Sequence, residues 1–215
     1  MEEMKDRWVK IVFDRVFAAV LIVIFMPFFL LVFVLNKLNG IFVPVDVGSV
    51  FFKIERISKG KIIHLLKFRT VKIEKLNQLQ SQDEDGRIDD IKPLEKDIAN
   101  LTWLGKYLRD FYVDELPQLF NILIGDISFV GPRPYPLSMY EQDLKKRIVR
   151  KKVIRCGLTG LVQINKANIK SKEEEIALDM EYIQKVRTLL PIRLLVYDGK
   201  IMLKSIRVVL KGQGL

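Results

Sequence analysis

The sequence predicts a mixed α/β, mostly helical domain with a membrane-embedded helical segment at its N-terminus. Three observations predict it: a long apolar run near the N-terminus, two strand-like segments after it, and segments of helical periodicity toward the C-terminus. With 215 residues, of which 49% are hydrophobic and 29% charged, the chain can form one domain with a core. We therefore expect a membrane segment over residues 1–39 and a second, polar domain over residues 40–215.

The charged and reactive side chains restrict the possible functions. A formal net charge of +10 favours anionic partners, which are nucleic acid, anionic lipid head groups or phosphorylated substrates. Cys156 is the single cysteine, so the chain has no internal disulfide and fits a reducing compartment. His64 is the single histidine, which argues against a multi-histidine metal site or a Ser-His relay. Carboxylates and hydroxyls remain for covalent chemistry.

The apolar run covers 20 residues, Val16 to Leu35, without a polar side chain. At about 1.5 Å per residue this run can cross a hydrocarbon layer of about 30 Å. Basic residues flank both ends, so the positive-inside rule does not separate the two sides. Pro27 lies in the middle and can kink a helix. From the residues alone we favour a spanning helix over a re-entrant hairpin.

Two strands and a loop are predicted next. Phe51–Ile54 and Ile62–Thr70 are typical of strands around a Ser58-Lys59-Gly60 turn. Lys67 and Arg69 have the same parity, so we expect both cations on one face of the second strand. The polar segment from Gln78 to Asp97 is typical of a loop.

Helix signals follow along the chain. Thr102 is expected to cap a short helix ending near Arg109, and Asp114 to be the N-cap of a second helix that runs to about Ile124 and stops at Gly125. The buried stripe of that second helix would contain Leu116, Leu119, Phe120 and Leu123, and a short strand is expected over Ile127–Val130.

Two longer helices are predicted at the C-terminal end. Ser171 and Glu174 form a capping-box pattern that opens a helix to about Leu189, and Pro191 begins the last helix. The last helix has an apolar face and a basic face, so it suits either a membrane interface or a core-packed helix with a solvated basic face. A second basic cluster, Lys145 to Arg155, can lie on anionic head groups. The apolar face of the last helix comprises Ile192, Leu195, Val196, Met202, Leu203, Ile206, Val209 and Leu210, and the basic face comprises Arg193, Lys200, Lys204, Arg207 and Lys211.

Adjacent carboxylates, Asp114 and Glu115, open a helical segment in this prediction. A helix N-terminus can bind phosphate, and a carboxylate there can attack phosphorus if its charge is offset. The simpler interpretation is an Asp cap with a Glu in the first turn, and on its own it is preferred. Arg133 lies between Pro132 and Pro134, which hold its backbone extended and favour a pre-oriented phosphate-binding guanidinium. Four cations from separate segments can converge on one anionic ligand: Lys67, Arg69, Arg109 and Arg133.

Several motifs, taken together, resemble the monotopic phosphoglycosyl transferases, which are bacterial sugar transferases that start glycan assembly on polyprenyl phosphate. They occur in the family's order after the N-terminal apolar segment and cover nearly the whole chain. One difference is Met26-Pro27, where the family usually has Ser-Pro. The motifs are Lys67-Phe68-Arg69-Thr70, Leu108-Arg109, Asp114 to Leu119, Gly125 to Pro134 and Gly157 to Gln163.

The resemblance implies a re-entrant helix-break-helix in the membrane and a small catalytic domain with amphipathic interfacial helices at the cytoplasmic face of the inner membrane. It implies transfer of a sugar-1-phosphate from a UDP-sugar to polyprenyl phosphate, such as undecaprenyl phosphate, with release of UMP. Asp114 would be the nucleophile that forms a phosphoaspartate, with Glu115 beside it, and both would hold Mg²⁺. The implied substrate-binding residues are Lys67, Arg69, Arg109, Gln118, Pro132, Arg133 and Pro134.

Two other classes remain open at this stage. One is a membrane-anchored scaffold that has lost the family's activity, which UMP release from a UDP-sugar would exclude. The other is a membrane-linked nucleic-acid binder, but the chain lacks the interleaved aromatic residues and motifs of such modules, so we expect no nucleic-acid partner. The expected partners are the UDP-sugar, polyprenyl phosphate and membrane lipids, and a homodimer is compatible with the resemblance. The sequence does not identify the sugar, the prenyl length or the glycan pathway.

Overall fold

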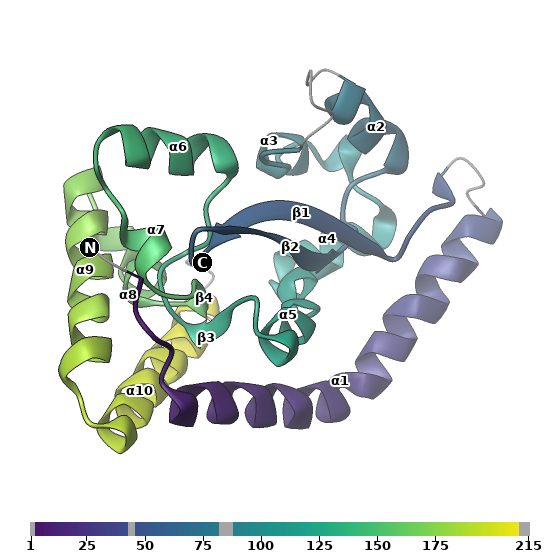
Figure 1. Ribbon diagram of the computed structural model, residues 1–215. Coiled ribbons are helices and arrows are strands. Elements are labelled where there is room, and N and C mark those ends of the chain that lie inside the picture. Colours follow the sequence, from purple (N-terminus) through teal and green to yellow (C-terminus); the bar gives the residue numbers. More distant parts are fainter. Residues whose placement is uncertain (1–2, 43–45, 82–87, 211–215) are drawn as a thin grey trace. The chain divides into compact units, whose positions relative to one another are not determined.

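The computed structural model describes residues 3–42, 46–81 and 88–210, and it is mostly helical with two small sheets (Figure 1). This confirms the predicted mixed α/β class. The chain divides into two compact units, which are described here one at a time. Unit 1 contains Met1–Ala18, Arg56–Ile63 and Asn121–Leu215, and unit 2 contains Ala19–Glu55 and His64–Phe120. The division into residues 1–39 and 40–215 remains a prediction.

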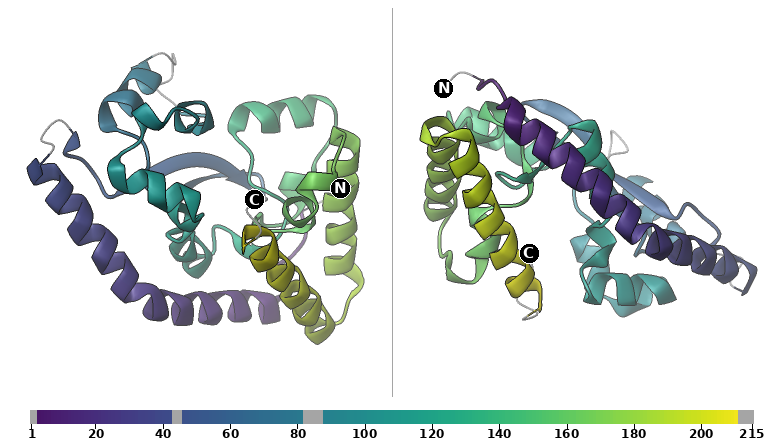
Figure 2. Two further views of the ribbon diagram at one scale, coloured as in Figure 1. Left: turned by 180° about the vertical axis from the view of Figure 1, so that it is seen from behind. Right: turned by 90° about the horizontal axis from the view of Figure 1, so that it is seen from below.

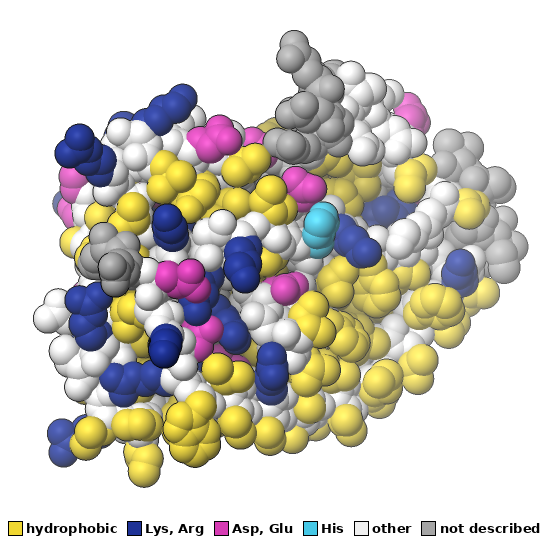
Figure 3. Space-filling model, viewed as in Figure 1, with side chains coloured by type: hydrophobic (Ala, Val, Ile, Leu, Met, Phe, Trp, Pro, Cys, Tyr) yellow, Lys and Arg dark blue, Asp and Glu magenta, His cyan; other side chains and the backbone are white. Residues whose placement is uncertain are grey.

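The apolar run lies in one helix, α1 (Trp8–Phe42), with Pro27 inside it. The helix-break-helix and its re-entrant course stay a prediction. Among the described residues, α1 is the one helix long and apolar enough to cross a membrane, and many of its apolar side chains are exposed. Figure 3 shows such hydrophobic side chains, in yellow, along the edge where Figure 1 draws α1. The helix therefore indicates membrane association.

A hairpin of β1 (Phe51–Ser58) and β2 (Lys61–Phe68) follows. Lys59 and Gly60 both have positive φ, as a two-residue type I′ turn requires, so the predicted turn is confirmed. Strand β2 ends at Phe68, which leaves Arg69 outside it.

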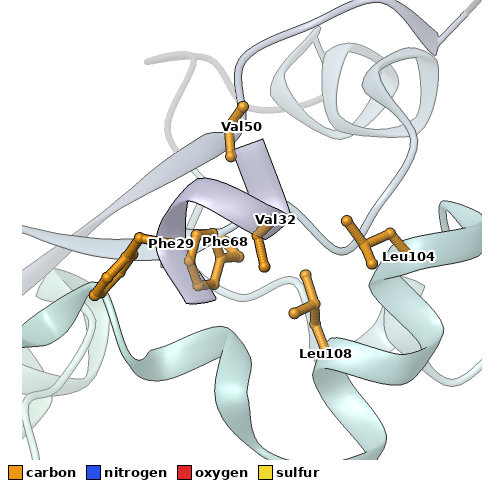
Figure 4. Packing of buried hydrophobic residues seen from close by; sticks show 6 residues of the cluster. All are labelled: Phe29, Val32, Val50, Phe68, Leu104 and Leu108. Carbon is orange, nitrogen blue, oxygen red and sulfur yellow. The ribbon is translucent and has the colours of Figure 1, made fainter. Parts of the chain in front are cut away.

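The core of unit 2 joins α1, the hairpin and α4 (Trp103–Asp110). Figure 4 shows six buried side chains of this core, with Phe68 next to Phe29 and Val32. Phe68 contacts the ring of Phe29 at a centroid distance of 5.5 Å and that of Phe51 at 5.6 Å. The cluster thus holds the end of β2 against the helix that precedes the acidic pair. Its members are Phe29, Val32, Val50, Phe68, Leu104 and Leu108.

The prediction of a loop from Gln78 to Asp97 is wrong at both of its ends. Helix α2 (Ile73–Ser81) extends into it, and α3 (Lys92–Glu95) lies within it, followed by the 3-10 turn η2 (Ile98–Asn100). Leu76 and Ile91 are buried against Val71 and Leu101, which local polarity did not reveal. Residues 82–87 lie outside the described part.

Unit 1 is built around the parallel pair of β3 (Ser128–Val130) and β4 (Gly157–Thr159). Strand β3 agrees with the predicted strand within one residue. Figures 1 and 2 show the helices of this unit gathered around the pair. These are α6 (Leu137–Lys145), α7 (Arg150–Val153), α8 (Leu161–Ile164), η4 (Lys166–Asn168), α9 (Lys172–Thr188) and α10 (Pro191–Leu210).

Both predicted C-terminal helices are confirmed. The Ser171 hydroxyl accepts from the Glu174 N–H, and Glu174 accepts from the Lys170 N–H rather than from that of Ser171. In α10, the buried face is a different stripe from the apolar one: Leu194, Asp198, Ile201 and Ser205. The predicted apolar face is largely exposed, so the core-packed interpretation of that face is wrong. Its exposed members are Ile192, Val196, Leu203, Ile206 and Leu210.

Candidate active site

The acidic pair lies in a short 3-10 turn between two helices. Helix α4 ends at Asp110, Tyr112 has a left-handed backbone with φ 55°, and the turn η3 (Val113–Glu115) follows. Helix α5 (Gln118–Ile124) begins three residues after Glu115. The prediction that Asp114 caps this helix is therefore wrong.

The main-chain hydrogen bonds of this segment show the difference. The N–H of Leu116 donates to the Val113 carbonyl at 3.1 Å, which closes the tighter 3-10 turn. The positive end of a helix is consequently not at Asp114, and the charge near this carboxylate comes from a side chain.

That side chain is Lys67, which β2 places next to both carboxylates. Its Nζ lies 3.1 Å from Asp114 Oδ2 and 2.8 Å from Glu115 Oε1. Asp114 is 5% exposed, while Glu115 is half-buried. One ammonium group is therefore shared by two carboxylates, and the more buried of the two is the predicted nucleophile.

Burial determines the protonation of this cluster. Burial raises the pKa of Asp114 to about 6; the positive charge of Lys67 opposes this shift, and the negative charge of Glu115 adds to it. Burial alone would lower the pKa of Lys67, but the charges of Glu115 and Asp114 raise it above its ordinary value. Near neutral pH the site thus holds a charged lysine and an ionised, poorly solvated Asp114.

Arg109 and Arg69 are bound to other groups of unit 2. The guanidinium of Arg109 pairs with Asp110 at 2.7 Å and donates to the main-chain oxygen of Glu95. Arg69 is buried and pairs with Asp46 at 2.6 Å. The expectation that Lys67 and Arg69 leave one strand face is wrong, because β2 ends before Arg69. Substrate binding by the two arginines remains a prediction.

The other predicted site residues fall in two places. Gln118 is buried at the start of α5 in unit 2. Pro132, Arg133 and Pro134 belong to unit 1, between β3 and α6. Within unit 2, then, the structure brings together Lys67, Asp114 and Glu115.

A buried charged cluster of unit 1 escaped the sequence prediction. The basic cluster Lys145 to Arg155 was expected on the surface, but Arg150 and Lys151 are each 1% exposed and pair with Asp179, both at 2.8 Å. Glu175 and Asp179 lie four residues apart on the predicted helix 172–189, and this acidic pair on one face was the available signal. Gln163, the last residue of the Gly157 to Gln163 motif, was not predicted as a site residue, and neither polar atom of its buried amide has a hydrogen-bond partner among the described residues.

Comparison with known proteins identifies the family of the chain. Residues 5–212 match the bacterial sugar transferase family, and the chain belongs to that family. The predicted resemblance to the bacterial sugar transferases, a family of transferases, is confirmed.

Individual relatives cover the chain to different extents. It is 30% identical to the undecaprenyl-phosphate galactose phosphotransferase of Salmonella typhimurium strain LT2, over 97% of this chain and 42% of the relative. It is 36% identical to the exopolysaccharide production protein ExoY of Rhizobium meliloti strain 1021, over 80% of this chain and 75% of the relative. An uncharacterized sugar transferase of Haemophilus influenzae is 30% identical over 100% of this chain and 43% of its own length. The chain thus spans less than half of the Haemophilus and Salmonella relatives.

Proposed function

We propose that this chain transfers a sugar-1-phosphate from a UDP-sugar to a polyprenyl phosphate, with Asp114 as the nucleophile. The observation that carries the proposal is the buried Asp114 carboxylate, which shares the Lys67 ammonium with Glu115. The names of relatives support the substrate class: the Salmonella protein acts on undecaprenyl phosphate, and a Klebsiella pneumoniae relative, 34% identical over 64% of this chain, is a UDP-glucose:undecaprenyl-phosphate glucose-1-phosphate transferase. The ExoY relative supports a role in polysaccharide synthesis.

The reaction runs in two steps that return the enzyme to its starting state. An Asp114 oxygen attacks the phosphorus that carries the sugar, and the bond from this phosphorus to UMP breaks. The sugar phosphate is then held as a phosphoaspartate. An oxygen of the lipid phosphate attacks the same phosphorus, and Asp114 leaves as a carboxylate. Two displacements replace one difficult transfer, which is the logic of covalent catalysis.

The surroundings of Asp114 suit the first step. Its carboxylate is nearly removed from water, which increases its reactivity toward phosphorus. The Lys67 ammonium lowers the repulsion between this carboxylate and an incoming diphosphate. Glu115 is more exposed and can place the lipid phosphate in the second step.

A magnesium ion is part of this proposal. Asp114 and Glu115 offer hard oxygen donors, and the described residues contain no group of three or more His, Cys, Asp or Glu side chains that could hold a metal. Two carboxylates fit Mg²⁺, because this ion keeps several waters and takes further ligands from substrate phosphates. When bound, the ion would offset the charge of the diphosphate.

We also propose that α1 re-enters the cytoplasmic face of the inner membrane rather than crossing it. Near the start of α1, Lys10 pairs with Asp198 at 2.6 Å and Asp14 accepts from Ser128 at 2.6 Å, all within unit 1. Toward its end, Phe29 packs on Phe68 within unit 2. Each part of α1 thus packs on later segments of its own unit, and this attachment on both sides of the apolar run supports a location of both ends on the same side of the membrane. The exposed aromatic side chains of Trp103, Tyr107 and Phe111 suit an interface, as does the exposed apolar face of α10.

UMP release tests the proposed function. Purified protein would be incubated with undecaprenyl phosphate, Mg²⁺ and each member of a UDP-sugar panel, and UMP would be measured. We expect UMP with at least one sugar, and none from the Asp114→Asn variant. Absence of UMP with every sugar, from protein shown to be folded, would contradict the proposal and favour a scaffold.

A further inference from the structure

The segment Gly131–Pro134 presents the predicted phosphate-binding arginine of unit 1. Arg133 is half-buried, and within residues 3–42, 46–81 and 88–210 its guanidinium has no hydrogen bond or ion pair. In this respect it differs from Arg69 and Arg109, which are both paired. A guanidinium without a partner is available for an anionic ligand, provided that its backbone is held in place.

Main-chain contacts hold the start of this segment on β4. The Gly131 N–H donates to the Thr159 carbonyl, and the Gly157 N–H donates to the Pro132 carbonyl, both at 2.9 Å. A Cβ on Gly157 would lie 2.1 Å from the Gly131 nitrogen, so this close approach requires glycine. The backbone just before Arg133 is therefore fixed.

Helix α9 fixes the flanks of the segment through two tyrosines. Before it, the Tyr182 hydroxyl donates to the Val130 carbonyl at 2.9 Å. After it, the buried Tyr135 hydroxyl accepts from Arg150 and from Lys172, both at 2.6 Å, and donates to Glu175. That hydroxyl makes every hydrogen bond available to it.

The Tyr135 ring is also surrounded by charge. The ammonium groups of Lys172 and Lys151 lie 4.3 and 4.4 Å from its centroid, and the guanidinium carbon of Arg150 lies at 5.1 Å. Arg150 is in turn paired with Glu175 at 3.0 Å and with Asp179 at 2.8 Å. Burial alone would raise the pKa of Glu175, but the Tyr135 hydrogen bond and the charge of Arg150 lower it below its ordinary value. The cluster therefore stays ionised and ties Tyr135 to α7 and α9.

We propose that Tyr135 is a positioning residue for Arg133: anchored by Arg150, Lys172 and Glu175, it holds the Arg133 backbone so that the free guanidinium meets the substrate's phosphate. This inference rests on the proposed function. In this inference the buried Tyr135 cluster affects catalysis only by fixing the position of Arg133.

A double-mutant cycle tests the inference. Tyr135→Phe keeps the ring and removes the hydroxyl, and Arg133→Ala removes the guanidinium. Because a small displacement of a positioned group can cost up to about a hundredfold, we expect Tyr135→Phe to lower kcat for UMP formation by roughly tenfold with little change in KM. In the Arg133→Ala background the same change should have less than about a twofold further effect. Tyr197→Phe removes a hydroxyl bonded to Glu181 at an exposed position of the same unit, and should leave kcat unchanged.

Two results would overturn the proposal. One is an equal fold-loss from Tyr135→Phe in both backgrounds, since a merely structural effect does not depend on Arg133. In Tyr135→Phe we expect faster hydrogen exchange at the Gly131, Arg133 and Tyr135 amides than in the wild type. The second contradicting result is an unchanged exchange rate at these amides. The exchange measurement needs no activity, so it separates failure of this inference from failure of the proposed function. If Tyr135→Phe does not fold, Lys172→Met, which removes one donor from a partly exposed side chain, replaces it in both measurements.

Discussion

Lys67 and Asp114 are 47 residues apart in the chain, and the lysine ammonium lies 3.1 Å from the carboxylate. Glu115 is on the same ammonium at 2.8 Å, so one cation serves two carboxylates. The lysine helps to keep the buried Asp114 carboxylate ionised near neutral pH. Because the same ammonium also serves Glu115, the negative charge of the pair is only partly balanced. Two predictions concern this cluster, two concern the helices expected at the membrane, and a fifth tests the nucleophile itself.

The pH dependence of UMP formation should follow Asp114. Its pKa is raised to about 6, so acid converts the nucleophile to a neutral carboxylic acid at a higher pH than for an ordinary aspartate. We expect the rate of the first step to fall about tenfold for each pH unit below 6 and to be flat from pH 7 to 8. A rate that stays constant down to pH 4.5 would contradict the raised pKa.

Removing Lys67 should damage both stability and activity. Lys67→Met leaves two carboxylates close together without their shared cation, and loss of one partner of a buried ion pair costs roughly 3 kcal/mol. The free energy of unfolding should fall by about this amount in urea titrations, and UMP formation should be lost. Lys67→Arg, which keeps the charge, should be less destabilised. Adding Glu115→Gln to Lys67→Met should recover part of the free energy of unfolding, because it removes the repulsion between the two carboxylates. A further decrease in the free energy of unfolding would contradict a shared cation.

Both ends of α1 should be accessible from the cytoplasm. Burial raises the pKa of Cys156 to about 11, so this thiol stays protonated and reacts slowly with labelling reagents. Single cysteines at Glu3 and at the exposed Val47 should therefore report the two sides in intact cells with a membrane-impermeant reagent. We expect neither to be labelled until the cells are opened. Labelling of Glu3→Cys alone in intact cells would show a spanning helix. Pro27→Ala should favour that form, because it restores a backbone donor.

The basic face of α10 should contribute to membrane binding. Lys200, Lys204 and Arg207 are exposed, as is much of the apolar face of the same helix. Changing all three to Glu should weaken binding to anionic liposomes by at least about tenfold, since each nearby charge contributes about 1 kcal/mol. The same change at the exposed Lys61, Lys96 and Lys170 is the matched control. Equal liposome binding by the two triple variants would contradict the prediction and show that the basic face of α10 is only solvated.

Local signals were sufficient for much of the fold. Thr102 caps α4 through the Gly105 N–H at 2.7 Å, and Gly125 ends α5 with φ 94°, as its position predicted. These features depend on neighbouring residues, which is why a single sequence reveals them. Polarity was a poor guide around α2 and α3, because a few apolar side chains such as Ile91 reach a core formed by distant segments.

Long-range pairing was the part that could not be predicted. Lys67 and Arg69 are two residues apart and equally basic, yet one binds Asp114 and the other Asp46. Arg150 and Lys151 have the composition of a surface cluster, and they are buried because α9 supplies Asp179. The end of β2 determines the partners of Lys67 and Arg69, and the packing of α9 determines those of Arg150 and Lys151. Residue spacing in the sequence predicts neither. The acidic pair itself was predicted by its motif, whereas its place in a 3-10 turn was not.

The most direct test of the nucleophile is a rapid-quench measurement of UMP from a UDP-sugar before any lipid acceptor is added. If Asp114 forms a phosphoaspartate, UMP should appear in a burst that approaches one molecule per active enzyme, and Asp114→Asn should show no burst. Glu115→Gln is the matched control at the adjacent carboxylate, and it should keep nucleotide binding while slowing transfer to lipid. A burst that persists in Asp114→Asn, or wild-type protein that forms UMP only when lipid phosphate is present, would contradict a covalent intermediate on Asp114.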